Sequence, residues 1–163
     1  MAHDRTALIR QLVATHDGEP WYGSSRMSLL KGLRYTEAAA QPVPGGHSIW
    51  ALVLHMTAWT NEVRRRVNGQ PPASPAEGDW PAVTEVSASA WEAARQALTT
   101  SHLQLVAALK SLPESRWSDA VGDTHNPALG TGLDVEGMVV GLAQHDAYHS
   151  GQIATLLRAA GLK

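Results

Sequence analysis

The chain has 163 residues, 44% of them hydrophobic, and a formal net charge of −2, which together predict one globular domain over residues 1–163. Its 13 Lys and Arg residues are scattered apart from Arg64, Arg65 and Arg66, so the sequence lacks the basic field that binds nucleic acid. The chain has no cysteine, which excludes disulfides, thiolate metal ligands and a thiol nucleophile supplied by the protein.

The N-terminal residues MAHDR contain no apolar segment of the kind found in secretory signal peptides. No stretch of the chain approaches the roughly 20 consecutive apolar residues that span a bilayer. We therefore expect a soluble, cytoplasmic protein that has neither a membrane nor a nucleic acid as its partner.

The first expected helix begins at Arg5, and Asp4 is placed to cap it. Four apolar residues recur in this segment at helical spacing: Leu8, Ile9, Leu12 and Val13. Gly18 and Pro20 then end the helix.

Two short helical segments are expected next. One runs from Ser24 or Ser25 to Leu33, and the other is a further turn over residues 36–41. The prolines that follow end the second segment, because proline has no backbone N–H to continue a helix.

A longer helix, of about five turns, is expected from Ser48 to Val67. Its apolar residues recur at helical spacing and are Ile49, Leu52, Val53, Met56, Trp59, Val63 and Val67. Asn68 and Gly69 are typical of a helix C-terminus. Residues 70–81 include four prolines and predict a solvent-facing loop, long enough to lie beside a pocket.

Two further long helices complete the expected fold. One covers residues 87–112 and ends at Pro113, and the other begins at a cap on Asp134 and ends at Gly161. Residues 118–132 between them predict irregular structure, and no alternating strand pattern occurs in the chain. The pattern favours an all-α fold with a four-helix core and short additional helices.

Histidines interrupt the apolar faces of two of these helices. In the final helix, His145 and His149 stand in a stripe that otherwise consists of Met138, Leu142, Ile153 and Leu156. Residues four apart lie within about 40° of one another around a helix, with Cβ atoms roughly 6 Å apart, so two imidazoles can share one ion. His55 lies on the apolar face of the Ser48 helix, between Leu52 and Trp59, and supplies a third inward imidazole.

Two interpretations of these histidines remain open at this point. A single histidine on an apolar face is usually a core residue satisfied by one hydrogen bond. Two buried imidazoles one turn apart are harder to explain in that way, because each needs partners and the two repel when both are protonated. Three histidines on facing helices would leave an open position on a tetrahedral ion, which suits catalysis better than structural binding.

The segment that starts at His145 is similar to the zincin motif, in which Glu follows the first histidine and acts as general base. Asp146 takes the place of that Glu, and residues 151–163 contain no third ligand, which argues strongly against a protease. Gln152 shares the face of His145 and His149, where we expect it to hydrogen-bond a ligand or a bound water, or to be a buried structural amide.

The remaining histidines are expected to be structural or solvent-exposed. His3, His16 and His125 are placed in termini or loops, and His102 lies on the 87–112 helix. His47 directly precedes the Ser48 cap.

Two segments resemble the DinB-like family, including its YfiT-type members: residues 47–55 (HSIWALVLH) and residues 145–153 (HDAYHSGQI). The family pattern has one histidine in the second bundle helix, then a His-x-x-x-His pair followed by Gly-Gln in a late helix. The resemblance extends over nearly the whole chain, including residues 21–23 and the loop that ends at residues 79–81.

This resemblance implies that His55, His145 and His149 are the metal ligands. It also implies an up-down-down-up four-helix bundle, a homodimer, and zinc, nickel or iron at the site, with zinc or nickel as the first expectation. Some relatives use a low-molecular-weight thiol such as mycothiol or bacillithiol, which would suit a chain without cysteine.

The leading hypothesis is an enzyme that acts on a small molecule by hydrolysis or thiol transfer at the open coordination position. A second hypothesis is a non-catalytic metal-binding protein of a stress response, or an interaction protein. A third is a metal-free bundle in which Trp50, Trp59 and Trp91 form an apolar core or ligand pocket. The pattern predicts a reaction class, and the walls of the pocket would decide the substrate.

Overall fold

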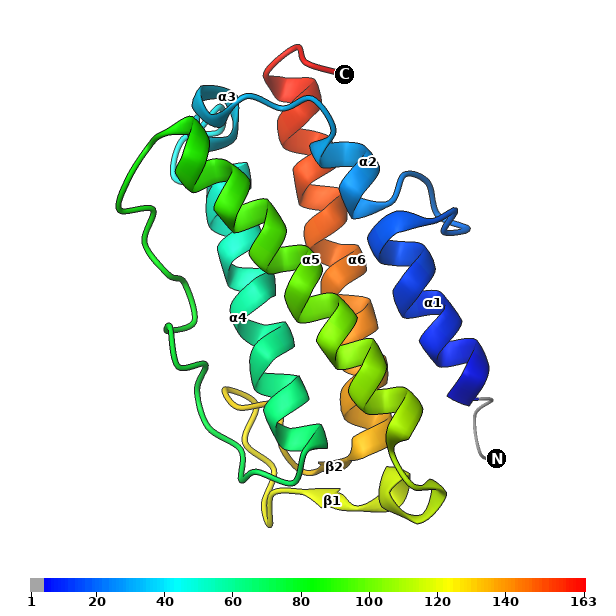
Figure 1. Ribbon diagram of the computed structural model, residues 1–163. Helices are drawn as coiled ribbons and strands as arrows, with labels where there is room; N and C mark the ends of the chain where they lie inside the picture. The colour runs from blue at the N-terminus through cyan, green and yellow to red at the C-terminus, as the bar shows by residue number, and fades with distance from the viewer. Residues whose placement is uncertain (1–4) are drawn as a thin grey trace.

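Four long helices dominate the computed structural model, which describes residues 5–163 (Figure 1). These helices are α1 (Arg5–Asp17), α4 (Ile49–Val67), α5 (Ala88–Ser111) and α6 (Val135–Ala159). The all-α prediction is confirmed, whereas Asp4 and His3 lie outside the described residues. No helix within the described part of the chain is long and apolar enough to cross a membrane.

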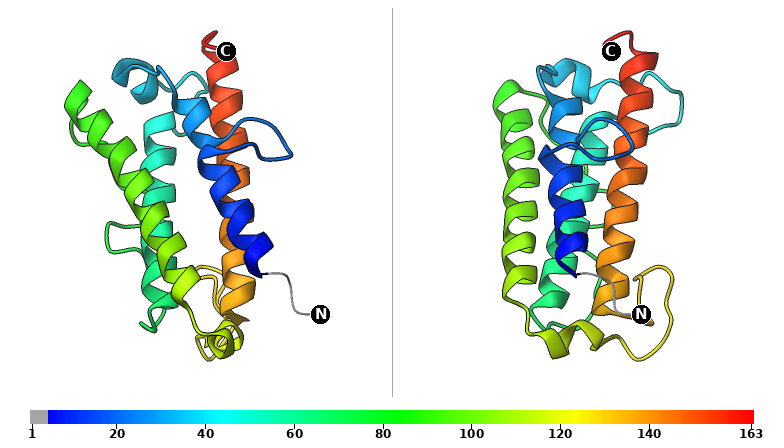
Figure 2. Two further views of the ribbon diagram at one scale, coloured as in Figure 1. Left: turned by 45° about the vertical axis from the view of Figure 1, so that its right-hand side comes forward. Right: turned by 90° about the vertical axis from the view of Figure 1, so that its right-hand side faces the viewer.

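The long helices form an up-down-down-up bundle, as the family resemblance implies. In Figure 1, α1 and α6 run upward while α4 and α5 run downward, and the views in Figure 2 show the same arrangement. α4 packs against α5 and α6, and α1 packs against the same two helices on the other side. Because α4 and α5 are parallel, residues 68–87 must return along the length of the bundle, and this long connection passes the candidate site.

Capping side chains set the starts of three long helices where the sequence predicts them. The side chains of Ser48, Ser87 and Asp134 accept hydrogen bonds from backbone N–H groups in the first turns of α4, α5 and α6. Such a cap typically contributes about 1 kcal/mol. The caps on Ser48 and Asp134 set where α4 and α6 begin, and these two helices carry the candidate metal ligands.

The short elements differ in detail from the prediction. The first short helix, α2 (Arg26–Leu30), ends earlier than expected, because Gly32 has a φ of +73°, and the second is α3 (Tyr35–Ala39). The irregular connection before α6 contains a 3-10 helix, η1 (Glu114–Ser118). It also contains two paired strands that the sequence did not predict.

The two strands, β1 (Ala120–Val121) and β2 (Leu133–Asp134), are antiparallel and pair Ala120 with Asp134 and Val121 with Leu133. Each has two residues, too few to show the alternation that identifies a strand in a sequence. The pair closes the lower end of the bundle beside α6 (Figure 1).

Two apolar clusters fill the bundle, one toward each end. The upper cluster includes Trp50, Trp91 and Ile153, and the lower one includes Leu12, Leu109 and Val139. On α5 and α6 the segments between these clusters carry buried polar side chains, and on α4 a buried histidine adjoins the upper cluster: Ser101, His102, Asp146, His149, Ser150 and His55. The candidate site belongs to this polar layer.

The tryptophans do not form one pocket. Trp50 and Trp91 are buried against each other, with ring centroids 5.2 Å apart. Trp59 lies apart from them and donates from Nε1 to the Asp79 carboxylate, over 2.7 Å. The hypothesis of a core built from all three rings is therefore correct only for the first two.

Candidate metal centre

The three predicted ligands meet where α4 and α6 pack together. His55 projects from α4, and His145 and His149 project from α6, one turn apart. One ring nitrogen of each residue lies within 4.8 Å of the corresponding atoms of the other two. The structure thus brings together, from 90 residues apart, the three side chains that the sequence pattern singles out.

The Nε2 atoms are the atoms that converge. His145 Nε2 lies 2.9 Å from His55 Nε2 and 3.1 Å from His149 Nε2. Two imidazoles bound at about 2.0–2.1 Å to one tetrahedral ion would place their nitrogens roughly 3.3 Å apart. These two separations need only a few tenths of an ångström of adjustment, and the third pair of ring nitrogens lies within 4.8 Å.

Hydrogen bonds at the opposite ring atoms fix two of the tautomers. His55 Nδ1 lies 2.5 Å from the backbone carbonyl oxygen of Asp79, and His149 Nδ1 lies 2.6 Å from the side-chain oxygen of Gln152. Since both partners are acceptors, both Nδ1 atoms carry the proton and both Nε2 atoms present a lone pair. Metal-binding histidines typically make this second bond to a carbonyl, carboxylate or water.

Burial keeps two of the rings in the neutral form that binds metals. Desolvation lowers the pKa of His149 to about 4, against the opposing effect of the Gln152 hydrogen bond, and the neighbouring His145 and His55 lower it further. The pKa of His55 is also lowered, mainly by desolvation. Because a protonated imidazole has no lone pair to donate, neutral rings near pH 7 are a requirement for metal binding.

The proline-rich connection forms one wall of the site. The Trp80 ring stacks on His55 at a centroid distance of 3.8 Å, and its other neighbour is His47, stacked at 3.5 Å. The Asp79 carboxylate accepts the Trp59 Nε1 hydrogen bond, which ties the loop to α4. The loop therefore lies beside the histidine cluster, and His47 both precedes the Ser48 cap and extends the stack.

One of the three rings is partly exposed to solvent. His55 and His149 are each 5% exposed, whereas the His145 side chain is 28% exposed. Solvent reaches the cluster past His145. The site residues that sequence reasoning missed are Asp79 and Trp80, which contact His55 from a loop, where helical periodicity gives no signal.

A second polar group lies deeper in the same layer. Asp146 and Arg26 form a buried ion pair, with Oδ2 and NH1 2.7 Å apart. Burial acts to raise the pKa of Asp146, but the charge of Arg26 outweighs it and holds that pKa below its ordinary value. Asp146 therefore points into the bundle as a carboxylate and does not occupy the position of a zincin general base.

The other histidines partly correct the sequence-based placement. His16 was expected in a terminus or loop, but α1 extends through Asp17 and buries it against α5. It stacks on His102, with ring centroids 4.1 Å apart and an interplanar angle of 12°. Both are structural, as expected, and neither is near the surface. His125 lies in an exposed loop as predicted, with Nδ1 3.0 Å from the Thr131 carbonyl oxygen.

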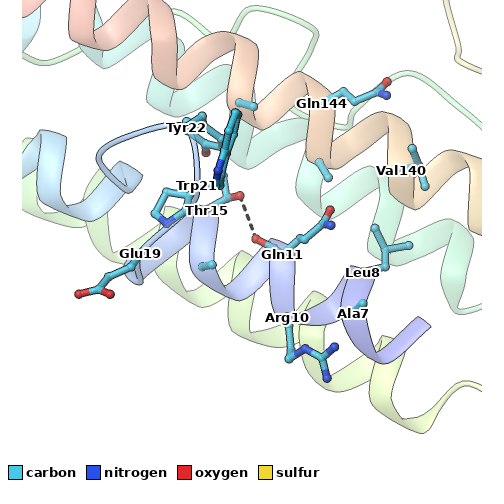
Figure 3. Close-up of a pocket in the computed structure, with 14 residues that line it drawn as sticks. Ala7, Leu8, Arg10, Gln11, Thr15, Glu19, Trp21, Tyr22, Val140 and Gln144 are labelled. Carbon is cyan, nitrogen blue, oxygen red and sulfur yellow. Dashed lines mark hydrogen bonds between the residues drawn. The ribbon is translucent and has the colours of Figure 1, made fainter. Parts of the chain in front are cut away.

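A groove between α1 and α6, of about 810 Å³, is separate from the histidine cluster (Figure 3). Trp21 and Tyr22 stand at one end of it, and Val140, Ala143 and Ala147 line its α6 side. At about 100° per residue, these α6 positions lie roughly half a turn around the helix from His145 and His149. The groove is therefore not the pocket of the metal centre.

Comparison with known proteins identifies the family. The family model of the DinB superfamily matches residues 26–153, which is 128 of the 163 residues. The match includes all three clustered histidines as well as Arg26, Trp80 and Gln152. Comparisons with curated proteins and with solved structures gave no match. The matched range covers most of the chain and contains the whole histidine cluster, and the chain belongs to the DinB superfamily.

Proposed function

We propose that this protein is a divalent-metal-dependent enzyme that acts on a small molecule, with His55, His145 and His149 as the ligands of one ion. The observation that carries the proposal is the convergence of their three Nε2 atoms, two of which present lone pairs because their Nδ1 protons are bound elsewhere. Converging ring nitrogens that present lone pairs need a positively charged or hydrogen-donating partner, and one shared cation satisfies all three.

The donor set supports catalytic use of the ion. Three neutral histidines leave the ion its full charge, and an ion so held supplies Lewis acidity and lowers the pKa of a coordinated nucleophile. The protein's own part is to orient the rings of His55 and His149 through Asp79 and Gln152, and to bound the site with Trp80. Since the chain has no cysteine, a thiol nucleophile would come with a cofactor or substrate.

The exposure of the site favours an enzyme over a purely structural metal site. Structural zinc sites are usually closed by four protein ligands, whereas catalytic sites keep one position open. Within residues 5–163, the grouped ligands are three histidines, and solvent reaches them past His145. This supports hydrolysis or thiol transfer over the alternative of a non-catalytic metal-binding or interaction protein.

Zinc and nickel are the ions that we propose first, with iron as an alternative. Imidazole nitrogen binds zinc, nickel, copper and iron, and geometry and availability decide which ion is held. A low-molecular-weight thiol is the proposed co-substrate if the reaction is a transfer.

Metal content tests the proposal. We expect elemental analysis of untagged wild-type protein to give about one ion per chain, as a single three-histidine site requires. His145→Ala and His149→Ala should each lose it, because two remaining imidazoles bind far more weakly. His125→Ala is the matched control, since this histidine lies in an exposed loop away from the cluster. Wild-type protein that is metal-free and fails to take up added zinc or nickel would contradict the proposal.

Cobalt substitution separates an enzyme from a closed metal site. If one coordination position is open, azide or a small thiol added to the Co(II) protein should change its visible spectrum. Turnover would then be sought with hydrolase substrates, and with thiol-transfer substrates in the presence and absence of a low-molecular-weight thiol. A spectrum that no added ligand changes would support the non-catalytic alternative.

A further inference from the structure

We infer that Arg26 and Asp146 act as a positioning pair for His145. In this arrangement Arg26 holds one carboxylate oxygen of Asp146, and the other accepts the Nδ1 proton of His145 and thereby aims its Nε2 at the ion. The consequence for metal affinity rests on the proposed function. The consequence for the His145 tautomer does not.

The three histidines of the cluster differ in what holds their Nδ1 atoms. His55 and His149 have acceptors, Asp79 and Gln152 respectively. Within the described part of the chain, His145 Nδ1 is buried without a hydrogen-bond partner, and so is Asp146 Oδ1. These two atoms lie 3.8 Å apart. With its proton on Nδ1, His145 faces Asp146 Oδ1 as a donor faces an acceptor, and the two are expected to pair because an unsatisfied buried polar atom is costly.

The remaining gap is small and can be closed from one side. A charge-assisted hydrogen bond is about 2.7–2.9 Å long, so the two atoms need to approach by roughly 1 Å. Asp146 is fixed, at 2% exposure, by its ion pair, whereas His145 is the most exposed of the three rings. A modest rotation of the His145 side chain therefore completes the contact while its Nε2 remains at the junction of the cluster.

Arg26 is placed to hold the carboxylate, and its NH1 also lies 3.8 Å from Met56 Sδ. It is the first residue of α2, is 1% exposed, and reaches across to α6 with NH1 2.7 Å from Asp146 Oδ2. Desolvation can make a buried ion pair less stabilising than apolar residues of the same volume. A role in orienting His145 explains why a charged pair, Arg26 and Asp146, occupies this buried position in place of apolar side chains.

A second buried carboxylate in the bundle shows the contrast. Glu62 on α4 accepts from Arg65 and Arg66 and from the backbone of Ala73, so both of its oxygens are in use. It holds the connection after α4 in place and faces no metal ligand. Asp146, by comparison, uses one oxygen in its ion pair and leaves the other facing His145.

Asp146→Asn tests the inference at the level of the tautomer. Arg26 should keep the amide oxygen as its acceptor, which would turn the amide NH2 group toward His145 Nδ1. The ring would then have to carry its proton on Nε2, the atom required for coordination. We expect 15N NMR of metal-free protein to show His145 as the Nδ1–H tautomer in wild type and as the Nε2–H tautomer in the variant.

Metal affinity gives the second readout. Changes in residues that orient metal ligands typically weaken binding about 10–100-fold, and we expect Asp146→Asn to fall in this range for zinc. Glu62→Gln is the matched control: it also breaks a buried carboxylate–arginine pair, and should lower the melting temperature while leaving zinc affinity within about twofold, because none of its partners touches the cluster.

A double variant keeps the test decisive if Asp146→Asn does not fold. Replacing a buried ion pair by apolar residues of similar volume is often neutral or stabilising, so Arg26→Met combined with Asp146→Leu should fold. It should still bind zinc about 10–100-fold more weakly than wild type. Wild-type affinity in this double variant would overturn the inference.

The tautomer also separates this inference from the proposed function. If wild-type protein takes up no metal but His145 changes tautomer in Asp146→Asn, the proposed function fails and the positioning pair stands. If wild-type His145 is already the Nε2–H tautomer, or if neither tautomer nor zinc affinity changes in the variant, the positioning pair is wrong.

Discussion

Two groups of histidines lie in the polar layer of one bundle, and they are arranged in opposite ways. In the cluster of His55, His145 and His149, the rings turn nitrogen atoms toward one point. The ring of His149 stands at 79° to each of the other two, which are tilted by 44° to one another. His16 and His102 instead stack face to face at 12°, with their nitrogen atoms at the rims of the stack. His16, His102, His55 and His149 are buried, whereas His145 is partly exposed.

The comparison shows that a neutral, buried imidazole is not by itself a metal ligand. Desolvation lowers the pKa of His16 to about 3 and that of His102 to about 4, just as it lowers that of His149 to about 4. The difference lies in the other ring nitrogen. Acceptors at Nδ1 turn the Nε2 atoms of His55 and His149 inward, whereas both nitrogens of His16 are buried without a partner among the described residues.

The largest expected effect separates the two groups by metal-linked stability. Zinc at 100 times its dissociation constant should stabilise the folded state by about 2.7 kcal/mol, which raises the melting temperature of a chain of this size by roughly 5–10 °C. Differential scanning calorimetry should show this shift in wild type and in His102→Phe, but not in His149→Ala. A shift that persists in His149→Ala would place the ion elsewhere.

Acid sensitivity is expected from the stacked pair, as it is from the other buried histidines whose pKa is lowered. Below pH 6.5 the two stacked histidines become protonated in the unfolded chain. In the folded state His16 and His102 stay neutral, because burial lowers their pKa. Stability is therefore complete above pH 6.5 and is lost as the pH falls toward 4, by about 2 kcal/mol per histidine at pH 5. Urea unfolding of metal-free protein at pH 7 and pH 5 measures the loss.

The matching variant is His102→Phe, which keeps a ring stacked on His16 but cannot take up a proton. We expect it to lose about 2 kcal/mol less than wild type between pH 7 and pH 5. An unchanged pH dependence would mean that His102 is already protonated, or is solvated, in the folded protein.

A smaller effect is expected from the ring that covers the cluster. Trp80 stacks on His55, and aromatic contacts of this kind contribute about 0.5–1.5 kcal/mol. Trp80→Ala should therefore weaken zinc binding about 2–10-fold in a calorimetric titration, and Trp80→Phe should restore most of it. Equal zinc affinity in all three proteins would mean that the Trp80 ring bounds the site without contributing to zinc binding.

The smallest effect is expected at the neighbouring residue. His55 Nδ1 donates to the backbone carbonyl of Asp79, while the Asp79 carboxylate accepts from Trp59. Asp79→Asn keeps the backbone carbonyl that accepts from His55 and a side-chain oxygen that can accept from Trp59. Zinc affinity should therefore change less than about threefold, within the range of a weak, partly exposed contact. A large loss would show that the carboxylate, 3.4 Å from His55 Nδ1, is the acceptor that matters.

The sequence predicts the parts of this structure that depend on spacing along a helix. The spacing of apolar residues and histidines reveals the inward faces of α4 and α6, through Leu52, His55 and Trp59 on α4 and Leu142, His145 and His149 on α6. The starts of these helices are recognisable from Ser48 and Asp134. Periodicity needs only a run of residues in one regular element, and all of these residues lie in such a run.

Contacts between elements were not predictable in this way. Asp79 and Trp80 reach His55 from a connection without periodicity, and Arg26 reaches Asp146 across 120 residues, counted from their positions in the chain. Asp146 is also adjacent to His145 in sequence, and neighbouring residues on a helix do not ordinarily face each other. His16 was misplaced because its burial depends on the packing of α1 against α5.

The central claim is that three imidazoles surround one ion, and X-ray absorption at the zinc edge tests it most directly. For the zinc-loaded wild-type protein we predict one ion per chain, with three imidazole nitrogens at about 2.0–2.1 Å and one further light atom. His125→Ala should give the same spectrum. A coordination sphere with fewer than three imidazoles, or an unchanged sphere in His149→Ala, would contradict the account.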